Sequence, residues 1–410
     1  MTWKALQHRH FARLFVASLI SEVGSKIHRI ALLVYVYTLT NEALWVSLTL
    51  AVQLIASIAA GPLLSAWADT QERRRLLVGS DLLRMVLVLL IPLIGFRSLP
   101  MLLVLTFLIE VLRTLHDPVA AAIIPDVLPE DTMDAANGLM LFAQRFAEVA
   151  FVGVAGALVA LIGAEPAFWV DAFTYLASAL LLLRLPRLEP SNSQQIAYWT
   201  RVRQGLSHIF GHPTIRYTIG TLFTAAMFGS VETALGLILA VSFLYAGAAG
   251  FGVMEAAMAL GAVLGTLCVP QLTTRIRREQ LFLWGLLVFG LLIASIGVFP
   301  VFAWVVVAYL LTGIVNMAFI VPLRSILQLN TPPELRTRTF TAVGAIANSA
   351  VLAGTLLCGF LEQPLGAPSV FFIAGLMVTL VALLVLLRGG IPTAGAAQAL
   401  PPTAEASQAA

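Results

Sequence analysis

Long apolar segments recur along the whole chain, and they constrain its fold more than any other feature. One of them runs from Leu44 to Trp67 without a single charged residue. A helix needs about 20 mostly apolar residues to cross a bilayer. Irregular backbone and open sheet edges cannot satisfy their hydrogen bonds in lipid, and these segments are too long and too continuously apolar for barrel strands. They therefore predict membrane-spanning α-helices.

Twelve such segments can be separated. Only 11% of the residues are charged, whereas a soluble domain carries about 25%. Most of the surface must therefore face lipid, and we predict an all-α membrane protein with twelve transmembrane helices. The predicted spans lie near 12–38, 44–67, 76–96, 99–120, 137–163, 167–185, 214–244, 249–272, 281–299, 301–325, 339–362 and 368–387.

Basic residues gather on alternate connections. Arginines follow spans two, eight and ten, at 73–75, 275–278 and 336–338, whereas most of the intervening loops contain neither Lys nor Arg. Arg97 is the one exception. Since basic residues in short loops stay in the cytoplasm, we expect a multi-pass protein of the cytoplasmic (inner) membrane with both termini cytoplasmic. We see no cleavable signal peptide, because charges interrupt the first apolar segment.

The chain also contains a repeat. Its two runs of adjacent arginines, at 73–75 and 277–278, and its two Pro-Glu pairs, at 129–130 and 333–334, are each 204 residues apart (277 − 73 and 333 − 129). A shift of six spans preserves orientation, so the repeat predicts two parallel six-helix halves. The predicted units are an amino-terminal half (1–188), a cytoplasmic linker (189–213), a carboxy-terminal half (214–388) and a disordered tail (389–410).

The linker has a helical pattern of its own. Apolar residues from Ile196 to Phe210 fall on one helical face, with most of the polar residues elsewhere. This pattern predicts an amphipathic helix, which either lies in the membrane interface or packs on the protein. The two cysteines lie within spans and are read as apolar packing.

Charged and polar side chains inside the spans are the candidate functional residues, because each is costly in lipid. In span one, Glu22, Lys26 and Arg29 share one helical face. Span four holds Glu110 and Arg113. The alternative is that these groups form static ion pairs that fix helix packing. The full set of candidates for a cavity and for proton coupling is Glu22, Lys26, Arg29, Glu110, Arg113, Glu232 and Asn316.

Other chemistry finds no support in the sequence. There is no phosphate-binding loop and no hydrolase motif, and the six histidines are scattered. We therefore expect no catalytic residues, no cofactor, no metal site and no nucleic-acid partner. The expected partners are a small amphiphilic substrate, protons and membrane lipid, and we expect the protein to be a monomer.

The segment after span two carries a resemblance to a known family. It reads Ser-Ala-Trp-Ala-Asp-Thr-Gln-Glu-Arg-Arg from Ser65 to Arg74. This segment resembles the loop motif of the major facilitator superfamily, and Asp69, Arg73 and Arg74 match that motif. The twelve predicted spans in two halves resemble the same family. Other stretches, such as "IIPDVLPEDTMDAANGL" and "VPLRSILQLNTPPELRTR", resemble the drug/proton antiporter-like branch that holds macrolide-efflux-type proteins and the enterobactin exporter.

The resemblance implies a mechanism. Asp69, Arg73 and Arg74 would form a latch that bridges helices at the cytoplasmic face, and spans one, four, seven and ten would line a cavity. The implied function is export of an amphiphilic small molecule, such as a drug or siderophore, by proton antiport with alternating access. The family's antiporter motif in span five is incomplete here, because the matching stretch keeps its glycines but has no proline. Two alternatives stay open: a lysophospholipid or metabolite transporter of the same fold, and a non-transporting membrane sensor or scaffold.

Overall fold

The computed structural model describes the backbone of residues 6–68, 71–94, 98–129, 132–186, 198–272 and 275–392. This part of the chain is helical and contains no strand. In chain order, the elements are α1 (Arg9–Thr40), α2 (Ala43–Ala68), α3 (Arg73–Ile94), α4 (Leu99–Val127), α5 (Met133–Ile162), α6 (Ala164–Leu182), α7 (Tyr198–Gly211), α8 (Pro213–Gly229), α9 (Val231–Ile238), the π-helix η4 (Leu239–Phe243), α10 (Gly247–Leu272), α11 (Arg278–Val298), α12 (Phe302–Leu329), α13 (Pro333–Leu365) and α14 (Ala367–Leu387).

Many of these helices have the length and composition of membrane spans. Within the described residues, eight helical stretches are long and apolar enough to cross a bilayer, and parts of α2 and α5 form shorter apolar helices. The long helix α1 is not among the eight, since it carries five charged residues between its ends. The all-helical prediction is therefore confirmed for the described residues, while the number of twelve spans stays a prediction.

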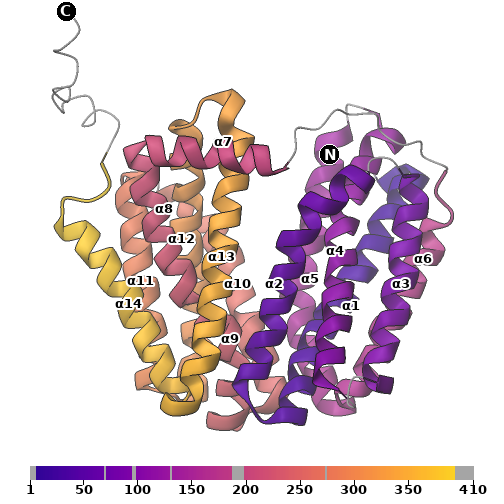
Figure 1. Cartoon of the computed structure of the whole chain (residues 1–410), viewed down its shortest axis with the longest axis horizontal. Coiled ribbons are helices and arrows are strands. Elements are labelled where there is room, and N and C mark those ends of the chain that lie inside the picture. Colours follow the sequence, from indigo (N-terminus) through magenta and orange to yellow (C-terminus); the bar gives the residue numbers. More distant parts are fainter. Residues whose placement is uncertain are drawn as a thin grey trace, which may run out of the picture.

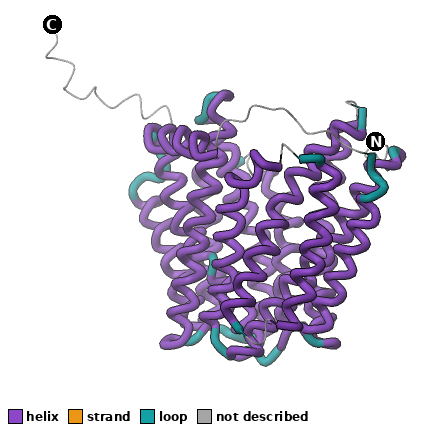
Figure 2. Tube along the Cα trace, turned by 45° about the vertical axis from the view of Figure 1, so that its right-hand side comes forward, coloured by secondary structure: helices purple, strands orange, loops and turns teal. Residues whose placement is uncertain are grey.

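The helices form two groups that lie side by side. Figure 1 shows α1–α6 as one group, called the amino-terminal group below, and α8–α14 with η4 as the other, called the carboxy-terminal group. Helix α7 lies across one end of the carboxy-terminal group, and α1 begins at the same end of the molecule. The remaining helices run roughly parallel to one another, with connections gathered at two ends (Figure 2). We call these ends the α7 end and the far end.

Contacts between the two groups occur near the far end. Tyr37, in the last turns of α1, hydrogen-bonds to Ser242 in η4. Helices α5 and α10 approach so closely that a Cβ atom on Gly156 would lie 2.6 Å from the Cα atom of Gly252. Small residues allow this kind of backbone approach between helices. The far end is therefore closed by direct helix-to-helix packing.

Helix α7 is docked on α13 at the opposite end. Gly205 of α7 lies against the backbone of Arg338 and the side chain of Ala342, and a ring nitrogen of His208 lies 3.3 Å from the carbonyl oxygen of Asn330. Val202 and Ile209 are buried. This face of α7 therefore packs on protein, which was one of the two predicted placements for the linker helix.

The predicted tail begins with residues that are packed. Ile391 is buried, and the hydroxyl of Thr214 donates a hydrogen bond to the carbonyl oxygen of Pro392, at 2.6 Å. These contacts hold the chain against the start of α8. The rest of the predicted disordered tail, 393–410, lies outside the described residues.

Candidate functional site

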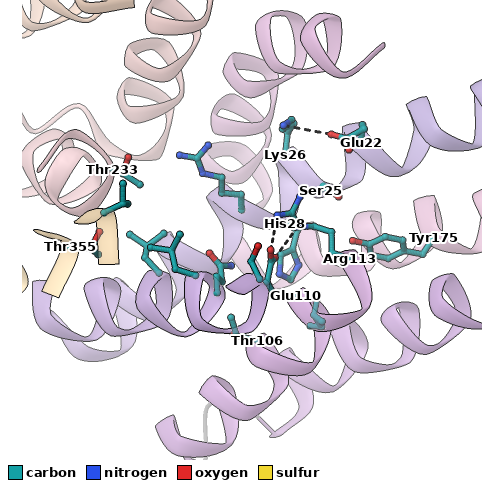
Figure 3. Close-up of a pocket in the computed structure, with 17 residues that line it drawn as sticks. Glu22, Ser25, Lys26, His28, Thr106, Glu110, Arg113, Tyr175, Thr233 and Thr355 are labelled. Carbon is teal, nitrogen blue, oxygen red and sulfur yellow. Dashed lines mark hydrogen bonds and ion pairs between the residues drawn. The ribbon is translucent and has the colours of Figure 1, made fainter. Parts of the chain in front are cut away.

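A cavity of about 350 Å³ lies between the two groups of helices. Helices α1, α2, α4 and α6 line it from one side, and α9 and α13 line it from the other. Figure 3 shows Thr233 and Thr355 on the side opposite Glu110 and Arg113. The cavity therefore lies where a relative movement of the two groups would reshape it.

Five of the seven predicted cavity residues line this space, namely Glu22, Lys26, Arg29, Glu110 and Arg113. Three of them come from α1, where spacings of four and three residues place them on one face. The other two come from α4. Of the four spans that the resemblance implies, spans one and four supply these five residues and span seven supplies Thr233, whereas no residue of α12 in span ten is among the lining residues.

Two ion pairs inside the cavity join residues of the same helix. The Nζ atom of Lys26 lies 3.6 Å from a carboxylate oxygen of Glu22. The guanidinium of Arg113 binds Glu110 with two hydrogen bonds, from Nε at 2.9 Å and from Nη2 at 2.6 Å (Figure 3). Bidentate pairs of this kind are among the strongest charge-assisted contacts in proteins. Glu110 and Arg113 therefore act as one unit in this structure.

A third ion pair joins the two groups. The Nη2 atom of Arg29, on α1, lies 3.1 Å from the Oε2 atom of Glu255, on α10. It is the one salt bridge between the amino-terminal and carboxy-terminal groups that the structure gives for its described residues. Glu255 was not among the predicted site residues. Its sequence signal was a single acidic residue in an otherwise apolar span, 249–272.

Glu232 and Asn316 do not line the cavity. Glu232 lies in the first turn of α9, next to the cavity residue Thr233, and only 3% of it is exposed. Its Oε1 atom has no hydrogen-bond partner in the structure, and its nearest polar neighbours include Thr312 and Glu255. Asn316 is half-buried on α12. The geometry thus separates a buried carboxyl behind the cavity from the charged groups that face it.

Buried polar contacts hold the amino-terminal group together. Asp81 and Arg84, both essentially buried, form an ion pair within α3. The guanidinium of Arg84 lies 4.6 Å from the ring centroid of Tyr175 on α6. On α1, His28 lies 3.1 Å from Asp171 of α6. The three-residue spacing of Asp81 and Arg84 suits a pair within one helix, whereas the His28–Asp171 contact joins distant parts of the chain and has no local signal.

The predicted latch is described only in part, because Asp69 lies outside the described residues. Arg73 forms an ion pair with Asp126 at the end of α4. Arg74 donates a hydrogen bond to the carbonyl oxygen of Leu185, just after α6, at 3.0 Å. Both arginines thus tie the start of α3 to neighbouring helix ends within the amino-terminal group. The latch itself stays a prediction.

Nothing in the described part of the chain resembles a metal centre, since no cluster of three or more His, Cys, Asp or Glu side chains could hold an ion. What the site offers instead is a small space with charged groups on one wall and hydroxyls on the other. Arrangements of this kind suit a molecule that has both a polar and an apolar part.

Comparisons with known proteins agree with this arrangement. A family described as transmembrane secretion effectors matches residues 1–407. The uncharacterized MFS-type transporter YvqJ of Bacillus subtilis is 22% identical over 399 residues, covering 94% of this chain and 92% of that protein. Macrolide efflux protein A of Streptococcus pyogenes is 19% identical over 384 residues, covering 91% and 94%.

Solved structures show the same fold. The nucleoside transporter NupG superposes with a TM-score of 0.77 at 14% identity, covering 92% of this chain and 99% of that one. A bacterial homolog of the human lysosomal transporter Spinster, in an inward-facing and occupied conformation, gives a TM-score of 0.75 at 14% identity, covering 92% and 96%. The cavity between two helix groups thus lies within a transporter fold. This chain belongs to the transmembrane secretion effectors, a family of major facilitator membrane transporters, and is not an enzyme.

Proposed function

We propose that this protein exports an amphiphilic small molecule across the cytoplasmic membrane, by proton antiport with alternating access. The observation that carries the proposal is a charged cavity between two helix groups whose contacts lie at one end. A transporter that works by alternating access needs a central site and two groups that can move against each other around it. The similarity to macrolide efflux protein A, which is named for efflux, supports transport in the outward direction.

The proposed topology follows from charge. The arginine-rich connections at 73–75 and 275–278 would lie in the cytoplasm, together with α7 and both termini. The far end, which is closed, would then face outward, and the structure would correspond to an inward-facing state. Twelve spans in two parallel six-helix halves, 1–188 and 214–388, complete the proposal, with the protein acting as a monomer.

Helix α1 belongs among the spans despite its charges. A charged side chain in a membrane helix is tolerated when it faces a cavity or a partner rather than lipid. Glu22, Lys26 and Arg29 all line the cavity, and each has an ionic partner. These three charges lower the apolar character of α1, and the cavity and their ionic partners keep them away from lipid.

The proposed proton-binding group is Glu232. A buried carboxylate is costly unless it is paired, and the structure gives Glu232 no ion pair within the described residues. Glu22 and Glu110, by contrast, are already paired with Lys26 and Arg113. A proton on Glu232 would remove the cost of its charge, and loss of that proton would favour a state in which water reaches the side chain.

Transport by the reconstituted protein tests the proposal. Proteoliposomes with an acidic lumen would receive three dansyl probes of similar size: dansylglycine (anionic), dansylglycinamide (neutral) and dansylcadaverine (cationic). We expect uptake of at least one probe, beyond the uptake by protein-free liposomes, to depend on the pH gradient and to raise the lumenal pH. Glu232→Gln should abolish the dependence on the gradient while leaving downhill exchange, and Glu279→Gln, at the start of α11 and away from the cavity, should change neither.

Two results would overturn the proposal. One is uptake that a protonophore does not affect. The other is a Glu232→Gln variant that still couples probe movement to protons as the unmodified protein does. Since the three probes share the dansyl group and carry different charges, the experiment also separates the question of coupling from the question of which substrate is carried.

A further inference from the structure

The charges of the cavity identify a substrate class. We propose that the cavity binds amphiphiles that carry an anionic group, such as a carboxylate, sulfonate or phosphate, and that Arg29 receives this group in competition with Glu255. The inference rests on the proposed function, because it assigns the ligand of the same cavity. It goes further in naming the sign of the ligand's charge and the contact that the ligand breaks.

The first support is that each arginine is more exposed than its carboxylate partner. The side chain of Arg113 is 46% exposed while that of Glu110 is 9% exposed. The side chain of Arg29 is 37% exposed while that of Glu255 is 12% exposed. Both arginines line the cavity, whereas Glu255 does not. Within these two pairs, the guanidinium groups are therefore more accessible to an entering ligand than the carboxylates.

The second support is the geometry of the Arg29–Glu255 pair. A guanidinium has five N–H donors in a planar fork and can hold a carboxylate or phosphate with two parallel hydrogen bonds. The one salt-bridge contact that the structure gives between these two side chains is Nη2 to Oε2, at 3.1 Å. The pair is thus less complete than the bidentate Glu110–Arg113 pair. An incoming anion can offer Arg29 a better contact than Glu255 does.

The third support comes from the opposite wall. Val351 of α13 supplies apolar surface there, and Thr233 and Thr355 supply hydroxyl groups across from Glu110 (Figure 3). No charged residue of α9 or α13 is among the lining residues. The site therefore has one charged wall and one uncharged wall, which matches a ligand with an anionic head and an apolar body.

Competition for Arg29 gives the binding event a consequence. The Arg29–Glu255 pair joins α1 to α10, across the boundary between the two groups. A ligand that takes Arg29 releases Glu255 and removes this link. Because a ligand shifts a conformational equilibrium only through contacts that differ between the states, this exchange is a direct way for an anionic ligand to favour separation of the groups at the far end.

Binding in nanodiscs made of phosphatidylcholine tests the inference without requiring transport. The probes are again dansylglycine, dansylglycinamide and dansylcadaverine, and dansyl emission reports occupancy. Since a hydrogen bond to a charged group is strong, we expect dansylglycine to bind at least about tenfold more tightly than the matched amide. Arg29→Gln should remove most of this preference. Arg75→Gln, an exposed arginine outside the cavity, should keep it.

The partner of Arg29 supplies a signature that a purely structural pair would not show. Glu255→Gln removes the competing carboxylate, so it should tighten dansylglycine binding by roughly threefold or more, opposite in direction to Arg29→Gln. If Arg29→Gln does not fold, Arg113→Gln provides a second test, with loss of preference expected. Equal weakening by Arg29→Gln and Glu255→Gln would overturn the inference, as would neutral or cationic probes that bind as tightly as dansylglycine.

The outcomes separate this inference from the proposed function. Export of the neutral or cationic probe, with weak binding of dansylglycine, would refute the anionic substrate class and leave proton-driven export standing. Tight, Arg29-dependent binding of dansylglycine without any transport would support the binding site and refute export.

Discussion

The close contact between α5 and α10 predicts how a single methyl group would shift the conformation. A Cβ atom on Gly252 would lie 2.8 Å from the Cα atom of Gly156, whereas non-bonded carbon atoms prefer about 3.5–4.0 Å. Gly252→Ala therefore forces the two helices apart at the far end. Overpacking of this kind costs ~1–3 kcal/mol, and the cost disappears when the groups separate. The ratio of open to closed far ends should rise by about five- to 150-fold.

Cysteine labelling in nanodiscs measures this ratio. Ser47 on α2 is fully buried at the far end, where Gly359 of α13 packs against it. We would introduce Ser47→Cys after replacing Cys268 and Cys358 with serine, and follow its reaction with a water-soluble maleimide. Because only the open state exposes this position, the labelling rate should follow the open fraction and rise at least about fivefold in Gly252→Ala.

The control uses a glycine in open surroundings. A Cβ atom on Gly220, in α8, would have no neighbour within 4 Å, so Gly220→Ala should leave the labelling rate unchanged. The reasoning is refuted if Gly252→Ala labels Ser47→Cys no faster than Gly220→Ala does. It is also refuted if the rate falls, since that would mean that the added methyl group stabilises the closed end.

Three further predictions concern stability. Arg84→Met leaves the buried Asp81 with only His116, at 3.7 Å, as an ionic neighbour, so it should lower stability by ~3–5 kcal/mol, seen as a lower Tm. Adding Asp81→Asn should recover part of the loss; equal Tm values for the single and double variants would contradict this. Gly205→Ala should undock α7 from α13 and speed limited proteolysis of α7, whereas Gly211→Ala, with open space around it, should not; equal cleavage rates would count against the packing. Burial, and then the charge of a histidine one turn earlier, lowers the pKa of His212 below its ordinary value of 6.5. Because the folded protein favours neutral His212, the contribution of this residue to the free energy of unfolding is complete above pH 6.5. That contribution is lost as the pH falls from 6.5 toward the lower pKa of the folded protein. His212→Asn should therefore flatten the fall in Tm from pH 7.5 to 5.5, and an unchanged slope would refute the assignment.

Much of the fold could be predicted because its signals are local. Apolar length predicts helices, and the spacing of Glu22, Lys26 and Arg29 predicts one shared face, which the cavity contains. The pairing of Glu110 with Arg113 also follows from a three-residue spacing. Such predictions need only the geometry of one helix. They are reliable because neighbouring residues on a helix have nearly fixed relative positions.

Contacts between distant segments could not be predicted in the same way. Arg29 and Glu255 are more than 200 residues apart, and so are Tyr37 and Ser242. Whether two such side chains meet depends on the rotation of each helix about its axis and on its neighbours, and apolar content alone does not determine either. Glu232 illustrates this limit, because its position in span seven was clear while its burial behind the cavity required the packed structure.

The π-helical turn at η4 has a consequence for the closure beside it. Its hydrogen bonds join residues five apart in the sequence, as in the bond from the Leu244 amide to the Leu239 carbonyl at 2.9 Å. In an α-helix the bonded residues are four apart. Converting this one turn to the α form would rotate the residues that follow by roughly 100°. Ser242, within the turn, would change its orientation as well and lose its hydrogen bond to Tyr37. A change of hydrogen-bond register within this single turn would thus break the Tyr37–Ser242 link and leave the Arg29–Glu255 ion pair to hold α1 to the carboxy-terminal group.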